Sequence, residues 1–154
     1  MFPDARVLTW NELAGIRDAG HEIASHGTRH VDLSLSTDSE VKMELLGSHH
    51  VFRSKGFDTS TYACAFNCYT RKADDMIDGL YRSIRGFPGK NFLPVEGHVY
   101  HVCAGNSMKE LEDARENQWI IGVWHDVDPK RFESDVVHVK KTGVRVATVG
   151  EMMP

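Results

Sequence analysis

Two histidines four residues apart, His26 and His30, are the residues of this sequence best suited to metal chemistry. They stand in the segment GHEIASHGTRH, residues 20–30, directly after a short apolar stretch typical of a β-strand. Neutral imidazoles at this spacing can point the same way and chelate a transition metal together. The spacing alone is a weak signal, because nine histidines in 154 residues produce such pairs by chance. The alternative is a capped turn in which each imidazole bonds to the backbone.

Alternating helices and strands must position this pair. A helix is predicted over residues 11–19, with Leu13 and Ile16 on one side and Gly20 as its end. Thr37 and Glu40 form a capping box that starts a second helix, reaching about Lys55. Strands are predicted at 21–25, 61–66, 80–85, 98–103, 119–124 and 144–149, and further helices at 71–79, 106–118 and 129–141. Six strands joined mainly by helices indicate a single compact α/β domain with a parallel sheet or barrel.

In parallel α/β folds, active sites gather at the carboxyl ends of the strands, where the loops leave. His26 follows the first predicted strand, Asn67 the second, and His125 ends the fifth. Three polar groups from distant parts of the sequence are therefore expected on one face of the sheet. His49 and His50 fall inside the helix that begins after Thr37, and we expect both to be solvated.

Composition excludes several classes of function. A net charge of −4 argues against a nucleic-acid partner, which normally requires a basic face. The longest apolar runs are too short for a membrane span, and Asp4 and Arg6 interrupt any signal sequence at the start. Three cysteines make no disulfide framework, because one is left over. Cys64 and Cys68 have a chelating spacing but no second pair follows, so packed or free thiols are expected.

The stretch from Thr9 to Leu33 resembles the NodB-type polysaccharide deacetylases, carbohydrate esterase family 4. These are metal-dependent enzymes whose second motif reads H-[ST]-x-x-H or close to it, commonly preceded by G-H-E-I. Gly27 stands here where the family has serine or threonine. Residues 119–127 are similar to the late apolar strand that ends in the catalytic histidine, and residues 142–149 to the last strand. The resemblance runs with gaps from Thr9 to Glu151.

The resemblance implies an incomplete or distorted (β/α) barrel of about six strands. It implies hydrolysis of an N- or O-acetyl group on a carbohydrate of the polysaccharide, chitooligosaccharide or peptidoglycan type. His26 and His30 would bind a divalent ion of the zinc type, and His125 would act as general acid, unless it merely ends a buried strand. The implied partner is an acetylated carbohydrate, and the implied location is the cell envelope or the exterior.

Residues 62–67 occupy the place of a family turn whose backbone N–H stabilises the oxyanion of the reaction intermediate. Ala65 stands where the family has proline and Asn67 where it has glycine, and asparagine tolerates a left-handed backbone. The resemblance makes the Phe66 N–H the oxyanion donor. Arg85 is a candidate for binding an acetyl or sugar oxygen, or else a charged strand terminus.

One part of the family pattern is absent. The third metal ligand and the catalytic base belong to an early T-F-D-D type motif, whereas the pair Asp74 and Asp75 follows the histidines and lies in a predicted helix. We therefore expect residues 1–154 to form one NodB-like domain that lacks its first strand–helix units, each about 30 residues long.

Such a domain would have a two-histidine half-site in an open barrel and little or no activity alone. Asp32 and Asp126 are the first residues to test for another base. One alternative is a non-catalytic carbohydrate-binding module on the same fold, which the missing aspartates and the altered turn favour. Another is a metal-binding structural domain, which rests only on the paired histidine and cysteine spacings.

Overall fold

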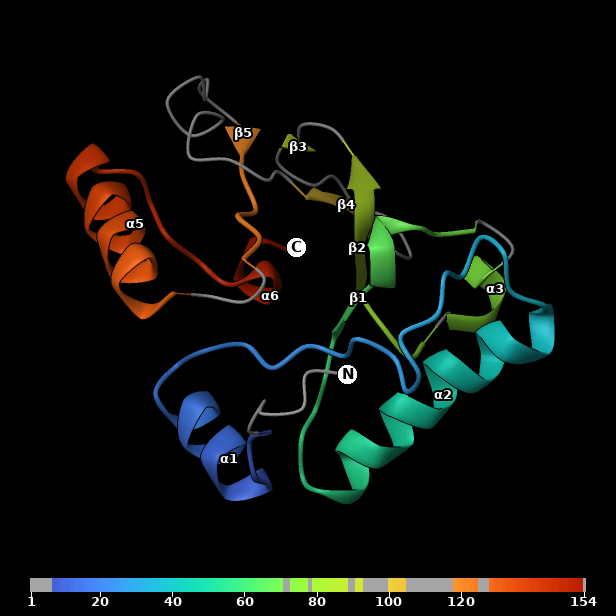
Figure 1. Cartoon of the computed structure of the whole chain (residues 1–154). Coiled ribbons are helices and arrows are strands. Elements are labelled where there is room, and N and C mark those ends of the chain that lie inside the picture. Colours follow the sequence, from blue (N-terminus) through green and yellow to red (C-terminus); the bar gives the residue numbers. More distant parts are fainter. Residues whose placement is uncertain are drawn as a thin grey trace.

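The protein is described by a computed structural model that covers residues 7–70, 73–77, 79–88, 91–92, 100–104, 118–124 and 128–153. Figure 1 shows a central group of strands with helices α2 and α3 on one side and α5 and α6 on the other. The helices are α1 (Trp10–Asp18), α2 (Asp38–Ser54), α3 (Asp74–Ile77), α5 (Pro129–Thr142) and α6 (Val149–Met152), with a 3-10 turn η1 (Ala65–Asn67). The strands are β1 (Thr61–Ala63), β2 (Ser83–Pro88), β3 (Asn91–Phe92), β4 (Tyr100–Ala104) and β5 (Gln118–Trp119).

The central sheet is parallel, as predicted. Its order is β1-β2-β4, with Tyr62 opposite Ile84 and Ile84 opposite His101. The segment before His26 adds one parallel bridge, between Ser25 and Tyr62. In that bridge the Ser25 N–H donates to Thr61 O at 2.9 Å, and the Ala63 N–H donates to Ser25 O at 2.7 Å. The predicted strand at 21–25 is thus an extended segment joined to the sheet at its end.

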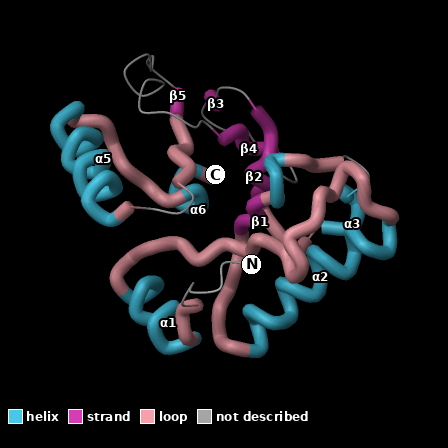
Figure 2. Tube along the Cα trace, viewed as in Figure 1, coloured by secondary structure: helices cyan, strands magenta, loops and turns pink. Residues whose placement is uncertain are grey.

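Three predicted helices are confirmed within one or two residues, and local sequence explains each (Figure 2). Both α1 and α2 begin at a capping box, Thr9 with Glu12 and Thr37 with Glu40. Each threonine hydroxyl accepts a backbone N–H three residues on, and each glutamate accepts the N–H of its threonine. Helix α5 begins with a proline after the cap Asp128 and ends at Gly143, whose φ is 74°.

The core lies between the buried face of α2 and the parallel strands. Its members are buried apolar side chains from four parts of the chain: Leu33, Val41, Leu45, Tyr62, Cys64, Ala73, Tyr81 and Ile84. Within the described residues of α5, by contrast, no side chain is buried. In the described part of the chain, no helix is both long and apolar enough to cross a bilayer.

The carboxy-terminal strands differ from the prediction. Residues 119–124 were expected as one strand buried on both faces, but β5 ends at Trp119 and pairs antiparallel with β3. Trp124 is exposed and packs against Phe132 of α5. Residues 144–148 form no strand, and α6 starts at Val149. An apolar run becomes a buried strand only where neighbours pair with it and cover it, so strand prediction fails here. The predicted helix at 106–118 lies almost entirely outside the described residues.

Candidate functional site

The predicted metal ligands lie side by side. The ring centroids of His26 and His30 are 4.8 Å apart, with an angle of 79° between the ring planes. His26 Nδ1 lies 2.6 Å from Ala63 O, the carbonyl of the last residue of β1. The histidine loop is therefore anchored at the carboxyl end of a parallel strand, which is where this fold class places its chemistry.

The turn after β1 packs against the second histidine. The Phe66 ring lies 4.8 Å from the His30 ring, and the Phe66 side chain is largely exposed. Phe66 and Asn67 have positive φ angles of 56° and 54°. A left-handed backbone was expected at Asn67, but at a bulky residue such as Phe66 it is strained. Among the described residues, no group accepts a hydrogen bond from the Phe66 N–H.

The sequence suggested that Arg85 ends its strand. In the structure it lies in the middle of β2. Its Nη1 donates to Asn67 Oδ1 at 2.5 Å, so it holds the turn that follows β1. Burial lowers the pKa of the Arg85 guanidinium from its usual value. Its backbone carbonyl accepts the Cys64 N–H at 2.8 Å. Arg85 therefore connects β2 to the turn, and its role in binding substrate stays a prediction.

The proposed catalytic acid, His125, and its neighbour Asp126 lie outside the described residues. The described residues hold no group of three or more histidine, cysteine, aspartate or glutamate side chains that could bind an ion. Asp32, a candidate base, accepts hydrogen bonds from the Ser34 hydroxyl and N–H, which lower its carboxyl pKa and weaken it as a base.

The two cysteines near the site are free thiols. Cys64 is buried in the core, and burial raises its pKa to about 12, which makes it unreactive. The side chain of Cys103 is not described.

The helix histidines correct another prediction. His50 is exposed as expected, but His49 is buried against the Tyr81 ring and its Nδ1 has no hydrogen-bond partner among the described residues.

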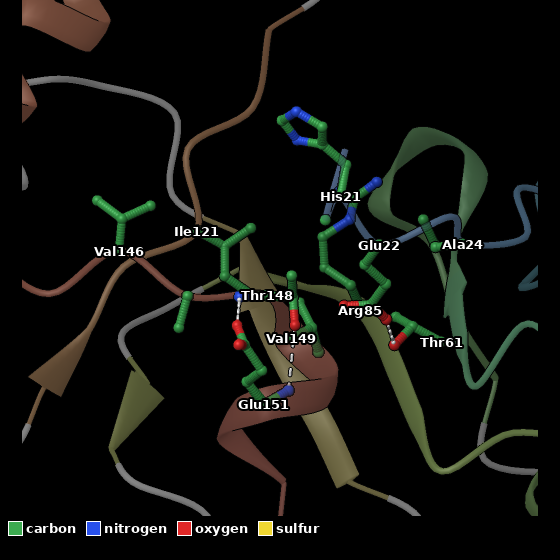
Figure 3. A pocket seen from close by; sticks show the side chains of 13 residues that line it. His21, Glu22, Ala24, Thr61, Arg85, Ile121, Val146, Thr148, Val149 and Glu151 are labelled. Atoms are coloured by element: carbon green, nitrogen blue, oxygen red, sulfur yellow. Dashed lines mark hydrogen bonds between the residues drawn. The ribbon is translucent and has the colours of Figure 1, made fainter. Parts of the chain in front are cut away.

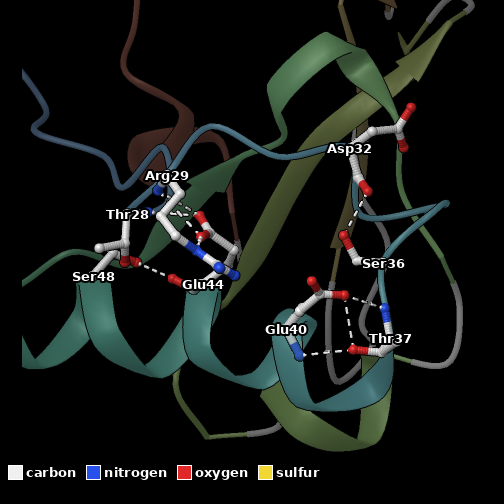
Figure 4. Close-up of polar contacts among 8 residues, drawn as sticks. All are labelled: Thr28, Arg29, Asp32, Ser36, Thr37, Glu40, Glu44 and Ser48. Carbon is white, nitrogen blue, oxygen red and sulfur yellow. Dashed lines mark hydrogen bonds and ion pairs between the residues drawn. The ribbon is translucent and has the colours of Figure 1, made fainter.

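Sequence reasoning missed a buried carboxylate beneath the histidine loop. Glu44 of α2 is 1% exposed and accepts the Thr28 N–H at 2.7 Å and the Arg29 N–H at 2.9 Å (Figure 4). The Arg29 Nε donates to it at 2.8 Å. The sequence does hold a signal, since Glu44 falls between Val41 and Leu45 on the apolar face of the helix. A charge at a core position is buried only when it is paired.

A cavity of about 490 Å³ adjoins the site through Ala63 and Arg85 (Figure 3). Glu22 crosses one side of it, with Oε1 accepting from the Thr61 hydroxyl at 2.5 Å and Oε2 accepting from the Gly150 N–H at 2.9 Å. Glu22 thereby joins the extended segment before the histidines to β1 and α6. The side chain of Val146 lines the same cavity.

Residues 4–77 match the model of the family described as polysaccharide deacetylase. This segment is of the polysaccharide deacetylase family. The family resemblance is thereby confirmed for this part of the chain, which contains the histidine loop, the Glu44 helix and the Phe66 turn. No curated protein sequence matches the chain.

Solved polysaccharide deacetylases share the fold. A CE4 family pseudoenzyme from Bacillus anthracis superimposes with a TM-score of 0.67 at 10% identity, over 94% of this chain and 50% of that one. The T48 deacetylase with substrate has a TM-score of 0.64 at 18% identity, over 93% and 69%. A polysaccharide deacetylase from Bacillus cereus has a TM-score of 0.53 at 18% identity, over 87% and 38%. The chain thus has a NodB-type fold and spans about half the length of the first of these relatives.

Proposed function

We propose that this chain is part of a metal-dependent polysaccharide deacetylase that removes acetyl groups from a carbohydrate. The observation that carries the proposal is the adjacency of His26 and His30 beside the carboxyl end of β1. It is supported by the family match, which covers both histidines.

The imidazoles of His26 and His30 would fill two coordination positions of a divalent ion of the zinc type. If His26 Nδ1 carries the proton that bonds to the Ala63 carbonyl, Nε2 is the nitrogen that would bind the ion. The His30 ring is 4.8 Å away, which suits a second imidazole ligand. Catalytic zinc usually takes three protein ligands, so a third would come from outside the described residues.

The residues of the chain would then divide the work. His26 and His30 bind the ion, which when bound polarises the acetyl carbonyl and lowers the pKa of a water molecule. The Phe66 N–H, for which no acceptor is found among the described residues, would donate to the developing oxyanion. Arg85 orients that turn through Asn67. His125 would protonate the leaving group.

We further propose that the 154 residues alone form an open, incomplete barrel with little or no deacetylase activity. Its support is that the chain spans about half the length of the first of the solved relatives. Robust acetate release by the purified chain would contradict this part of the proposal.

A second candidate is a non-catalytic carbohydrate-binding protein on the same fold. One observation favours it, because a solved relative with a TM-score of 0.67 is itself described as a pseudoenzyme of the family. Acetate release by a form of the protein that includes the third metal ligand would count against it. Glycan binding without turnover and without zinc would support it.

Zinc titration by calorimetry tests the metal pair. Changing His26 or His30 to alanine should lower zinc affinity about 10-fold or more. The matched control is His50→Ala, an exposed histidine on α2 outside the site, which should leave the affinity unchanged. Unchanged zinc binding in the His26 and His30 double variant would remove this site from consideration. In an active form, His125→Ala should lower kcat roughly 10²-fold at constant metal content.

A further inference from the structure

The loop that carries the two histidines is held from below by one side chain. Three N–H groups, those of Thr28, Arg29 and the Arg29 guanidinium, point at the two carboxylate oxygens of Glu44 at 2.7–3.1 Å (Figure 4). Glu44 comes from the middle of α2 and is 1% exposed, whereas the Arg29 side chain is 44% exposed. A carboxylate is buried here because each oxygen has donors.

The close approach of Glu44 also dictates the residue at position 27. Gly27 has a φ of 83°, and a Cβ there would lie 2.5 Å from Glu44 Oε2 and 2.9 Å from the Tyr62 hydroxyl. No side chain fits into this space unless the carboxylate moves away. The departure of this sequence from the family pattern, glycine in place of serine or threonine, is therefore matched to the position of Glu44.

One helical turn on, Ser48 holds the start of the same loop. The Ser25 hydroxyl donates to Ser48 Oγ at 2.8 Å, and the Tyr81 hydroxyl donates to Leu45 O at 3.0 Å. Ser25 and the Thr28–Arg29 backbone are thus both fixed to one face of α2. His26 lies between these two attachments, and His30 follows directly after the second.

We infer that Glu44 is a positioning residue for the histidine pair, acting through the backbone of Thr28 and Arg29 to hold His26 and His30 in chelating geometry. This inference rests on the proposed function, because it assigns Glu44 to the same metal pair. Burial alone would raise the pKa of Glu44, but the hydrogen bonds from Arg29 and Thr28 outweigh it and bring the pKa below its usual value. The Glu44 carboxylate, which with its bonds to Thr28 and Arg29 is called the clamp below, is therefore charged at neutral pH.

The variant that tests the clamp is Glu44→Gln, which keeps the volume of the side chain. A glutamine has one acceptor oxygen and turns an NH₂ group toward donors, so it cannot accept all three N–H groups. The matched control is Glu40→Gln, the same change four residues earlier on the same helix. Among the described residues, the hydrogen bonds of Glu40 lie within its own capping box, where glutamine can serve, and its only link to the clamp is the attraction between its charge and that of Arg29.

Two measurements on the metal-free chain decide whether the clamp holds the loop. In Glu44→Gln, hydrogen exchange of the Thr28 and Arg29 amides should accelerate about 10-fold or more, and the NMR cross-relaxation between the His26 and His30 rings should weaken. Both signals should be unchanged in Glu40→Gln. Unchanged exchange and cross-relaxation in Glu44→Gln would overturn the inference. If Glu44→Gln does not fold, Glu44→Asp serves instead, because the shorter side chain keeps the charge but draws the carboxylate away from the Thr28 and Arg29 amides; unchanged exchange there would overturn the inference.

Zinc titration then decides whether the clamp serves the metal pair. Zinc affinity should fall about 10–100-fold in Glu44→Gln and stay constant in Glu40→Gln. A loosened loop with unchanged zinc affinity would overturn the positioning role. If the parent chain binds no zinc, the proposed function fails, while the exchange and cross-relaxation results still decide whether Glu44 orders the histidines.

Discussion

Two regions of this chain have comparable sequence patterns but different packing. In the region of α2, an amphipathic helix buries Val41, Glu44, Leu45, Ser48 and His49 against the parallel strands. Helix α5 is also amphipathic, yet none of its residues is buried, and Phe132 and Val137 are both more than 40% exposed. The pattern of a helix thus predicts that the helix forms, whereas its partners decide how much it contributes to stability.

The family match covers the packed region around α2 and does not reach α5. The family match ends at residue 77, and six of the eight buried residues of the core described above lie within it. The histidine loop and its Glu44 clamp lie in this packed region. Matched substitutions on α2 and α5 can therefore test whether the packed region accounts for most of the free energy of unfolding.

The largest expected effect is loss of a core side chain. Leu45→Ala removes a fully buried side chain and should lower the free energy of unfolding by about 2–5 kcal/mol. Val137→Ala on α5, at 44% exposure, should change it by no more than about 0.5 kcal/mol. Urea unfolding followed by circular dichroism measures both. Equal losses would show that α5 is packed in solution and would break the comparison.

A pair of glycines gives a second, smaller contrast. Gly27 and Gly143 both have positive φ, 83° and 74°, but a Cβ at Gly143 would have nothing within 4 Å. Gly143→Ala should cost about 1 kcal/mol, the strain of the left-handed backbone. Gly27→Ala should cost roughly 1–3 kcal/mol more, because it also displaces Glu44. Similar midpoints of thermal unfolding for the two variants would mean that the histidine loop moves away from Glu44 without a loss of stability.

The smallest expected effect is a dependence on pH. Burial first, and then the charges of Arg53 and His50, lower the pKa of His49 below its usual value of 6.5. The unfolded state therefore binds the proton first, so stability is full above pH 6.5 and falls as pH drops toward the folded pKa. Urea midpoints at pH 7.5 and 5.5 should differ less in His49→Gln than in the parent. An equal change would assign the pH dependence to other groups, and His138→Gln on α5 is the control.

Local signals in the sequence predicted the helices and the histidine pair well. The capping boxes at Thr37 and Thr9 are complete within four residues, so no distant contact is needed to specify them. His26 and His30 lie in one loop after one extended segment, and their adjacency likewise follows from short-range geometry. The parallel order of the central strands followed from the alternation of strand and helix.

The interactions that sequence reasoning missed all depend on distant partners. Glu44 lies within a predicted helix, but its partners are the backbone N–H groups of Thr28 and Arg29, which its own segment does not specify. The sequence predicts a strand end at Arg85, but β2 continues to Pro88 because it pairs there with β4, a distant segment. The expected strand at 144–149 failed for the same reason, since pairing cannot be derived from the segment itself.

The contacts of Glu44 and Glu22 also imply an order of folding. Glu44 meets Thr28 across 16 residues, whereas Glu22 meets Gly150 across 128, a loop three doublings longer. Each doubling adds about 0.6 kcal/mol to the entropy of loop closure, or roughly 2 kcal/mol in all. We expect the histidine loop to close on α2 early, and the end of the chain to join Glu22 late. Kinetic φ-values should then be higher for Glu44→Gln than for Glu22→Gln, and the reverse order would contradict this sequence of events.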